Sequence, residues 1–124
     1  MKNYPYYPIY LDIENRNVII IGGGEVCARK AETMMRYGAR VTIVSPQFTP
    51  EIEGWARDGQ LTIRRKRYET SDIEDAHIVI ASTDDTSVNE QVAADSRARR
   101  IPVNVVDVTP VSYTHLTLPT ICSV

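Results

Sequence analysis

The feature that most constrains the fold is an apolar run that leads directly into three consecutive glycines and then a helix. Residues 18–21 read Val-Ile-Ile-Ile, which is typical of a buried strand, and residues 22–24 are all glycine. Residues 28–37 then have helical spacing. A tight turn beside a helix N-terminus is how proteins hold the pyrophosphate of a dinucleotide, so this junction predicts a dinucleotide site.

Two of the glycines have distinct expected roles. Gly22 would let the chain leave the strand with dihedrals that a side chain forbids, and Gly24 would let the backbone approach a phosphate without an intervening Cβ. The pattern G-x-G-x-x-G/A fits except at its third position, where Cys27 is larger than Ala but still small. A glycine-rich turn with no ligand is the alternative, and the flanking strand and helix favour the dinucleotide site.

The residue that would hold the adenine ribose is not the usual one. NAD sites commonly place an acidic residue at the end of the strand that follows the helix after the glycine turn. In this chain that strand is expected at residues 41–44, and Ser45 follows it. Glu51 is too far along the chain, and Arg40 lies at the wrong end of the strand for an obvious 2′-phosphate site. The residues alone therefore leave NAD and NADP open.

Strands and helices alternate along the chain. Strands are expected at residues 8–11, 18–21, 41–44, 61–65, 76–82 and 102–106, and helices at 28–37, 50–58 and 86–99. The strands are continuously apolar, which is typical of a parallel sheet covered on both faces. We therefore predict an α/β fold, a Rossmann-like doubly wound parallel sheet of about five strands with helices on both faces.

Local signals mark the ends of the helices. Thr49 and Pro50 read as an N-cap followed by proline at the first helical position, and Gly38 and Gly59 read as helix stops. The first helix carries one apolar stripe, formed by Cys27, Ala31, Met34 and Met35. Ser71 and Asp72 are expected to cap one short helical turn.

Polar residues follow the strands at the edge where such sheets bind ligands. Thr83 and Asp84 follow the fourth of the core strands, and they are either cofactor contacts or caps of the next helix. Asn89 lies one turn into that helix, where it either faces the cleft or is exposed. Asp107 follows the last expected strand, at residues 102–106. On position alone, Asp107 is either a catalytic carboxylate or an ordinary loop residue.

Composition excludes several classes of protein. A net charge of −2 argues against a general nucleic-acid binder. The basic run at residues 64–67 is expected to be a solvated strand end and turn, the alternative being a phosphate-binding role. Cys27 and Cys122 have no framework spacing, so no disulfide is implied, and Cys27 is expected to pack in the fold. His77 and His115 belong to no Cys/His cluster, which argues against a zinc site. No signal peptide or membrane-length apolar run is visible, so we expect a cytoplasmic protein.

Several separated motifs occur together in one order. They are YPIYL at 7–11, VIIIGGGEV at 18–26, RK at 29–30, GARVTIVSP at 38–46, ASTDD at 81–85, VN at 88–89 and NVVD at 104–107. In this order they resemble the precorrin-2 dehydrogenase family, the N-terminal module of siroheme synthases. The resemblance implies NAD⁺-dependent oxidation of precorrin-2 to sirohydrochlorin, with Fe²⁺ insertion in some members and a homodimer for the complete protein.

The resemblance also implies roles for individual residues. The expected cofactor contacts are Gly22, Gly23, Gly24, Glu25, Val26, Ser45, Pro46, Thr83 and Asp84. Asp107, the aspartate of the NVVD motif, corresponds to the essential acidic residue of the family, and a carboxylate there could position the macrocycle and accept or relay a proton. No resident metal is expected.

Two other classes of protein have sequence requirements that can be compared with this chain. A non-catalytic NAD-sensing module would share the glycine turn but would need no carboxylate after the fifth strand. A short-chain dehydrogenase needs a Tyr-x-x-x-Lys pair, and none of Lys2, Lys30 and Lys66 has a tyrosine four residues before it. That class is therefore excluded.

The end of the chain departs from the family pattern. Residues 111–124 have no helical stripe and resemble vector-derived or out-of-frame sequence, the alternative being a divergent native strand. We therefore expect residues 1–108 to form an NAD-binding Rossmann domain and residues 109–124 to be a non-native or divergent tail. Because the family builds its tetrapyrrole pocket from later segments, we expect this chain to bind NAD⁺ with little precorrin-2 turnover.

Overall fold

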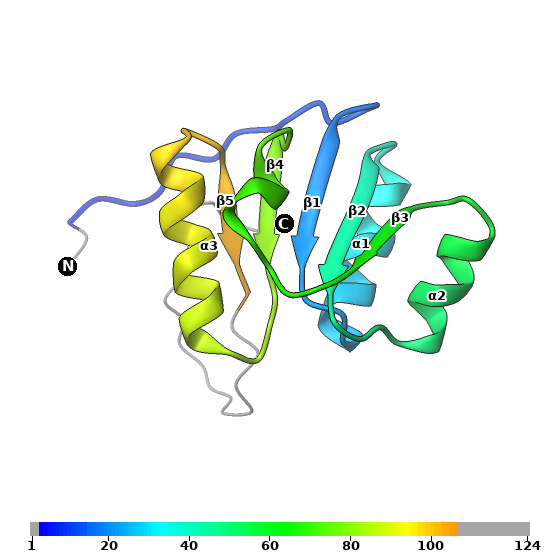
Figure 1. Cartoon of the computed structure of the whole chain (residues 1–124). Helices are drawn as coiled ribbons and strands as arrows, with labels where there is room; N and C mark the ends of the chain where they lie inside the picture. The colour runs from blue at the N-terminus through cyan, green and yellow to red at the C-terminus, as the bar shows by residue number, and fades with distance from the viewer. Residues whose placement is uncertain (1–2, 107–124) are drawn as a thin grey trace.

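A parallel β-sheet with helices on both faces forms the frame of the protein (Figure 1). The structure is a computed structural model that describes residues 3–106. The strands are β1 (Asn17–Ile21), β2 (Arg40–Ser45), β3 (Thr62–Arg65), β4 (Ile78–Ala81) and β5 (Val103–Val105). The helices are α1 (Glu25–Arg36), α2 (Pro50–Arg57), α3 (Thr86–Ala98) and the short 3₁₀ helix η1 (Thr70–Ile73). The predicted α/β fold is confirmed.

The order of the strands sets the position of the site. The sheet runs β3-β2-β1-β4-β5, with every pair parallel. From β1 the chain adds β2 and then β3 on one side. After β3 it crosses the sheet and adds β4 and β5 on the other side of β1. Ile21 at the end of β1 lies beside Val44 of β2 and Ala81 of β4, so the three strands end at the same level. Ligands of doubly wound sheets bind at such a switch point.

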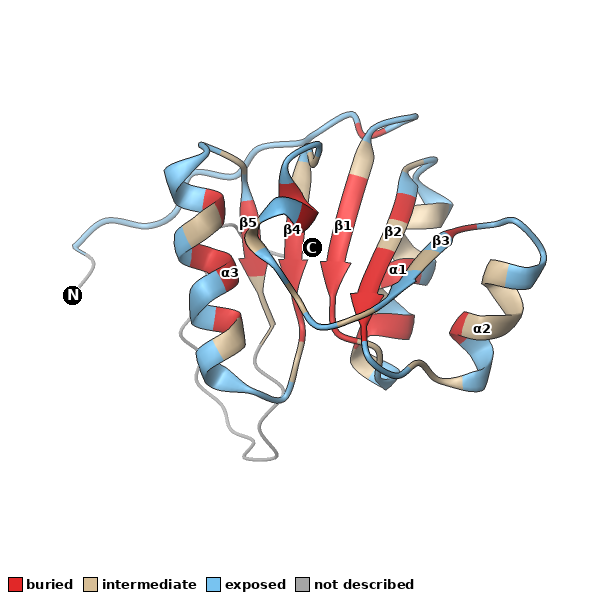
Figure 2. Cartoon of the chain, viewed as in Figure 1, coloured by how far each residue is buried: buried red, intermediate tan, exposed pale blue. Residues whose placement is uncertain are grey.

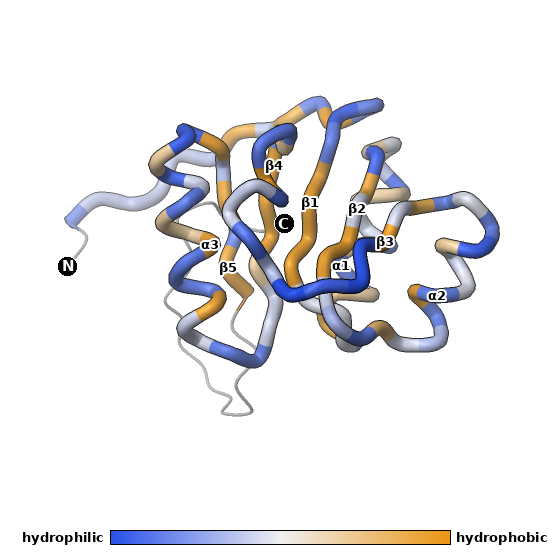
Figure 3. The backbone as a smooth tube through the Cα atoms, viewed as in Figure 1, coloured by the Kyte–Doolittle hydropathy of each residue, from blue (hydrophilic) through white to orange (hydrophobic). Residues whose placement is uncertain are grey.

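Each face of the sheet buries its own apolar cluster. One cluster joins α1 and α2 to the sheet, and its buried members are Val18, Ile20, Cys27, Ala28, Ala31, Val41, Ile43, Ile52, Leu61 and Ile80. The other joins α3 and η1 to the opposite face, with Ile19, Ile21, Val44, Ile73, Val79, Ala81, Val92 and Val103 buried. Figure 2 shows many of the buried residues along the central strands β1, β2 and β4, and Figure 3 shows these strands as largely hydrophobic. Full burial of each such isoleucine contributes about 1.5–3 kcal/mol.

The ends of the helices follow their sequence signals. The Thr49 hydroxyl accepts a hydrogen bond from the Ile52 N–H at 3.2 Å, and Pro50 occupies the first turn of α2. Gly38 and Gly59 follow the C-caps of α1 and α2 with φ of +84° and +77°, a conformation that favours glycine. These predicted starts and stops are confirmed.

Two local predictions are wrong. Residues 8–11 join none of the five strands of the sheet, and their apolar side chains are not buried, because Ile9, Tyr10 and Leu11 are all exposed. The short helical turn is present, but Glu69 is its N-cap rather than Ser71 or Asp72. Asp72 instead occupies the third helical position, where its carboxylate accepts a hydrogen bond from the Glu69 N–H at 2.8 Å.

Candidate dinucleotide site

A cavity of about 810 Å³ lies across the carboxyl ends of β1, β2 and β4. Its lining comes from the glycine turn, the loop after β2, the segment after β3 and the loop between β4 and α3. The lining residues are Ile21, Gly22, Gly23, Gly24, Glu25, Val26, Val44, Ser45, Pro46, Gln47, Phe48, Thr49, Arg67, Tyr68, Ser82, Thr83, Asp84, Asp85, Val88 and Gln91. The structure therefore brings all nine expected cofactor contacts to one cavity at the switch point.

The first two glycines of the turn are required by the fold. Gly22 has φ of +128°, and a Cβ there would lie 2.8 Å from the Ser82 carbonyl oxygen. A Cβ on Gly23 would overlap the Gln47 carbonyl oxygen. Any side chain at either position would thus collide with backbone, and at Gly22 it would also strain the chain. The dihedral expectation for Gly22 is confirmed.

The third glycine of the turn, Gly24, is not required by the fold itself. Gly24 has an extended backbone with φ of −90°, which any residue adopts, and a Cβ added to it would meet nothing within 4 Å. That Cβ would project into open space at a residue that lines the cavity. Absence of a side chain at Gly24 therefore leaves room for a ligand, as a pyrophosphate cradle requires.

Helix α1 supplies hydrogen-bond donors next to this open position. Its first intrahelical hydrogen bond is donated by the Ala28 N–H to the Gly24 carbonyl oxygen at 3.0 Å. The N–H groups of Glu25, Val26 and Cys27 consequently have no carbonyl within the helix. Together with the positive end of the helix dipole, they suit an anion, so the residues present fit a dinucleotide pyrophosphate.

The loop after β2 is tied to the glycine turn. The Thr49 N–H donates to the Gly23 carbonyl oxygen at 3.1 Å, and the Ser45 hydroxyl accepts from the Gln47 N–H at 3.3 Å. Ser45 is nearly buried, and the neighbouring Pro46 is exposed at the cavity. The position after β2 thus carries a hydroxyl where NAD sites commonly carry a carboxylate.

The loop after β4 is held by a buried amide. Asn89 of α3 is buried, its side-chain oxygen accepts from the Thr83 N–H at 3.1 Å, and its amide donates to the Thr83 carbonyl at 2.9 Å. The N-cap of α3 is Asp85, so the interpretation of Thr83 and Asp84 as caps is wrong. Hydrogen bonds from the Ser87 side chain and from the Val88 and Ser87 N–H groups lower the pKa of Asp85.

Cys27 is a packing residue. It belongs to α1 and is fully buried in the apolar cluster between the helix and the sheet. Burial raises the pKa of its thiol to about 12, against the smaller opposing effect of a hydrogen bond with Ser82. A thiol fits where the dinucleotide motif usually has Gly or Ala, and the expected packing of Cys27 in the fold is confirmed.

Sequence reasoning favoured a solvated turn for the end of the basic run and did not place the segment after β3 at the cavity. Arg67 and Tyr68 both line the cavity, and the Tyr68 hydroxyl donates to Asp95 of α3 at 2.7 Å. Burial, together with this hydrogen bond, raises the pKa of Tyr68. The sequence could have placed this segment at the site. The strand at residues 61–65 was expected in the parallel sheet, so the residues after it had to lie at the same edge as Ser45.

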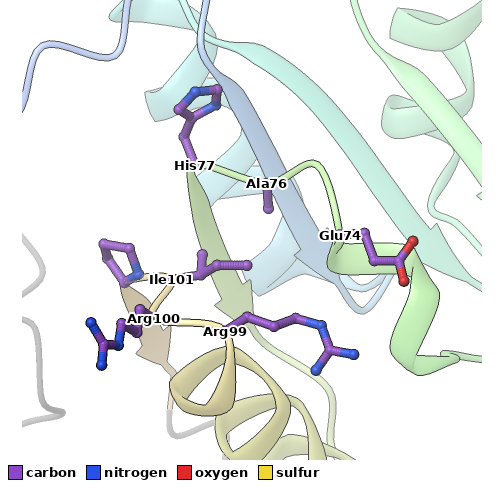
Figure 4. A pocket seen from close by; sticks show the side chains of 7 residues that line it. Glu74, Ala76, His77, Arg99, Arg100 and Ile101 are labelled. Atoms are coloured by element: carbon purple, nitrogen blue, oxygen red, sulfur yellow. The ribbon is translucent and has the colours of Figure 1, made fainter.

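A second cavity, of about 580 Å³, lies at the opposite, amino-terminal edge of β4 and β5 (Figure 4). Its charged lining comes from Glu74, Arg99 and Arg100, with His77 at the start of β4. His77 has the structural role expected of it, since its Nδ1 accepts a hydrogen bond from the Asn17 N–H at 3.3 Å. The arginines follow the C-terminal end of α3, whose carbonyl dipole disfavours anions. The dinucleotide cavity is therefore the better candidate site.

Other expectations concern residues 107–124 or absent features. Asp107, the expected catalytic residue, lies outside the described residues, as does Cys122. Within residues 3–106, no group of three or more His, Cys, Asp or Glu is placed to hold a metal ion. In the same range, no helix has the length and apolar character needed to cross a membrane.

The fold and the site together define a class of protein. A parallel sheet of order β3-β2-β1-β4-β5, with a glycine turn and a helix N-terminus at its switch point, is a Rossmann-type dinucleotide-binding domain. The chain belongs to the protein family described as "Putative NAD(P)-binding", whose model matches residues 9–118.

Curated relatives point to the same module. The chain is 42% identical over 106 residues to a siroheme synthase of Nitrosospira multiformis, a match that covers 82% of this chain and 22% of the relative. It is 44% identical over 104 residues to a siroheme synthase of a Psychrobacter species, a match that covers 84% of this chain and 21% of the relative. The chain thus spans about a fifth of the length of these relatives. The resemblance to the N-terminal module of siroheme synthases is confirmed.

A solved structure agrees in fold and in sequence. The precorrin-2 dehydrogenase SirC is 28% identical to this chain and superposes with a TM-score of 0.70. The match covers 91% of this chain and 54% of SirC. The part of the chain that carries the dinucleotide cavity is therefore similar to the corresponding part of a dehydrogenase.

Proposed function

We propose that this chain is the NAD⁺-binding module of an enzyme that oxidises precorrin-2 to sirohydrochlorin. The observation that carries the cofactor part is Gly24, whose missing Cβ leaves open space beside the free N–H groups of α1. The substrate part is supported by the similarity to SirC, a precorrin-2 dehydrogenase. When bound, the nicotinamide would accept a hydride equivalent from the macrocycle.

Different residues of the cavity would contact different parts of the cofactor. The N–H groups at Glu25 and Val26 would bind the pyrophosphate, and Ser45 and Pro46 would contact the adenosine end. Thr83 and Asp84, after β4, would contact the nicotinamide half. Asn89 would act as a positioning residue, because it clamps the loop that carries them.

Asp107 is the proposed catalytic carboxylate. It follows β5 in the sequence, and oxidation of precorrin-2 removes a proton as well as a hydride. A carboxylate there would accept or relay that proton and orient the ring. This role rests on the family resemblance of the NVVD motif.

Calorimetric titration of this chain with NAD⁺ tests the cofactor part. We expect saturable binding with one site per chain. A Gly24→Val variant, whose side chain would fill the cradle, should not bind. Absence of NAD⁺ binding by the unsubstituted, folded chain would overturn the proposal.

A second experiment separates an enzyme from a non-catalytic NAD-sensing module, which the comparisons do not favour. Residues 3–107 would replace the matching segment of the Nitrosospira multiformis siroheme synthase, and NADH formation from precorrin-2 would be followed without oxygen. We expect turnover by the hybrid and its loss in Asp107→Asn with NAD⁺ binding retained. Unchanged turnover in that variant would contradict the role of Asp107.

Four further statements stay predictions. The complete protein is expected to be a homodimer, as the resemblance implies. A cytoplasmic location and no binding of nucleic acid are expected from the sequence itself. The resemblance also implies that some members of the family insert Fe²⁺ as a second substrate. Sedimentation of the complete protein measures the first, and iron insertion into sirohydrochlorin measures the last.

A further inference from the structure

A basic run at the end of β3 reaches the dinucleotide cavity. Figure 3 shows this hydrophilic stretch crossing at the lower edge of the sheet in that view, in the direction of α3. The Lys66 N–H donates to the Ser45 carbonyl oxygen at 3.0 Å, so the run is fixed beside the end of β2. The next residue, Arg67, lines the cavity together with Ser45.

The first three members of the run are occupied by local partners. Arg64 contacts Asp72 at 3.3 Å, and Lys66 pairs with both Asp72 and Glu69. Arg65 contacts Glu53 at 3.4 Å and lies over the Phe48 ring at 5.0 Å from its centre. Arg64 and Arg65 are exposed, as expected for a solvated strand end, and the ion pairs of all three residues also tie β3 to α2 and η1.

Arg67 is different. It is exposed, and it has no hydrogen bond or ion pair with any residue in the described range 3–106. It is also the one cationic side chain among the described residues that line the cavity. The acidic lining residues lie elsewhere in the cavity, since Glu25 begins α1, and Asp84 and Asp85 lie in the loop after β4.

The charge around the end of β2 decides which dinucleotides can bind. An NAD-specific site places a carboxylate there, which accepts hydrogen bonds from the ribose and repels a 2′-phosphate. This chain has the Ser45 hydroxyl instead, with an unpaired guanidinium on the neighbouring segment. Arginine is well suited to phosphate because its planar fork donates two parallel hydrogen bonds.

We propose that Arg67 binds the 2′-phosphate of NADP⁺, so that the cavity accepts NADP⁺ as well as NAD⁺. The inference rests on the proposed function, because it places the adenosine end of the same dinucleotide beside Ser45. Arg67 is then a specificity-determining residue that contacts only the phosphate by which the two cofactors differ.

Titration of the full chain with NAD⁺ and NADP⁺ tests this, using Arg67→Gln and a matched Arg36→Gln control. Arg36 is exposed in the last turn of α1, outside the cavity. We expect the unsubstituted chain to bind both cofactors. Arg67→Gln should weaken NADP⁺ about tenfold or more and NAD⁺ less than about twofold, since an arginine–phosphate contact is a charge-assisted hydrogen bond. Arg36→Gln should change neither.

The fragments 2′,5′-ADP and 5′-AMP sharpen the test, because they differ by the 2′-phosphate alone. Only 2′,5′-ADP should lose affinity in Arg67→Gln, and only its binding should weaken markedly with added salt. Equal loss of both fragments would place Arg67 on the part they share and overturn the proposal. NAD⁺ binding without NADP⁺ binding by the unsubstituted chain would overturn it and leave the proposed function intact. Failure of both cofactors would reject the proposed function itself.

Discussion

Replacing Gly24 by alanine separates a ligand-binding glycine from a structural one. The added methyl group meets no protein atom within 4 Å, and φ of −90° is open to alanine. Alanine is the poorer N-cap by about 0.5–1 kcal/mol. It also restricts the unfolded chain, which stabilises the fold by about 0.4–1 kcal/mol. The two effects offset, so the free energy of unfolding should change by less than about 1 kcal/mol.

Cofactor binding should respond far more strongly. On the proposed function, the methyl group would take up space at the cavity that a pyrophosphate needs to approach the N–H groups at Glu25 and Val26. Loss of one charge-assisted hydrogen bond costs about 1.5–3 kcal/mol, which corresponds to a roughly 10- to 150-fold weaker affinity for NAD⁺. Urea denaturation would measure stability, and calorimetric titration would measure affinity.

Gly54→Ala is the matched control. Gly54 lies inside α2, away from the cavity, and its added Cβ would approach only the Arg57 guanidinium at 4.0 Å. This variant should gain about 0.5–1 kcal/mol of stability and bind NAD⁺ normally. Unchanged NAD⁺ affinity in Gly24→Ala would refute the role of Gly24 in making room for the pyrophosphate. Loss of the folded state in Gly24→Ala would also refute it, because Gly24 would then be a structural glycine.

The remaining predictions concern residues that support the site. Gly22→Ala should destabilise the fold by about 2 kcal/mol or more in urea denaturation, because positive φ and a backbone clash combine. Asn89→Ala should cost about 1–3 kcal/mol by leaving the Thr83 N–H unsatisfied, and hydrogen exchange should show that loop opening more often. In a Cys122→Ser background, Cys27 should resist iodoacetamide at neutral pH, since its pKa is about 12, and should react once urea unfolds the chain.

Much of the fold follows from local patterns. The continuous apolar strands and the turn residues between the helices place five strands and three main helices nearly where they are found. Parallel pairing was predictable because the strands lacked alternation and helices separated them. The segment at residues 8–11 misled because a short apolar stretch suggests a strand, whereas its side chains Ile9 and Leu11 are exposed and it pairs with no strand of the sheet.

The site was predictable only where it depends on the strand ends. Residues directly after a strand must lie at the carboxyl edge of a parallel sheet, which placed Ser45 and Thr83 correctly near the glycine turn. Arg67 follows a strand too, but its importance depends on which neighbours satisfy the charges of Arg64, Arg65 and Lys66. Such pairing is a tertiary property, and a run of four basic residues does not reveal it.

The ion pairs around Asp72 also connect the stability of the fold to the cofactor site. Burial raises the pKa of Asp72, but hydrogen bonds from Lys66 and from the Glu69 N–H outweigh it and leave the pKa below its usual value. A carboxyl whose pKa is depressed by folding contributes stability above its unfolded pKa of about 3.9, and this is lost as the pH falls through the folded value.

Asp72→Asn should therefore be destabilised at neutral pH and should flatten the acid limb of the stability curve, measured by urea denaturation between about pH 2 and pH 7. Because Lys66 precedes Arg67, loosening the Asp72 pairs should also release the segment that carries Arg67 beside Ser45. NADP⁺ affinity should then fall more than NAD⁺ affinity in this variant, although Asp72 does not line the cavity. An acid limb identical to that of the unsubstituted chain would refute the electrostatic role of Asp72, and equal loss of both cofactors would refute its link to Arg67.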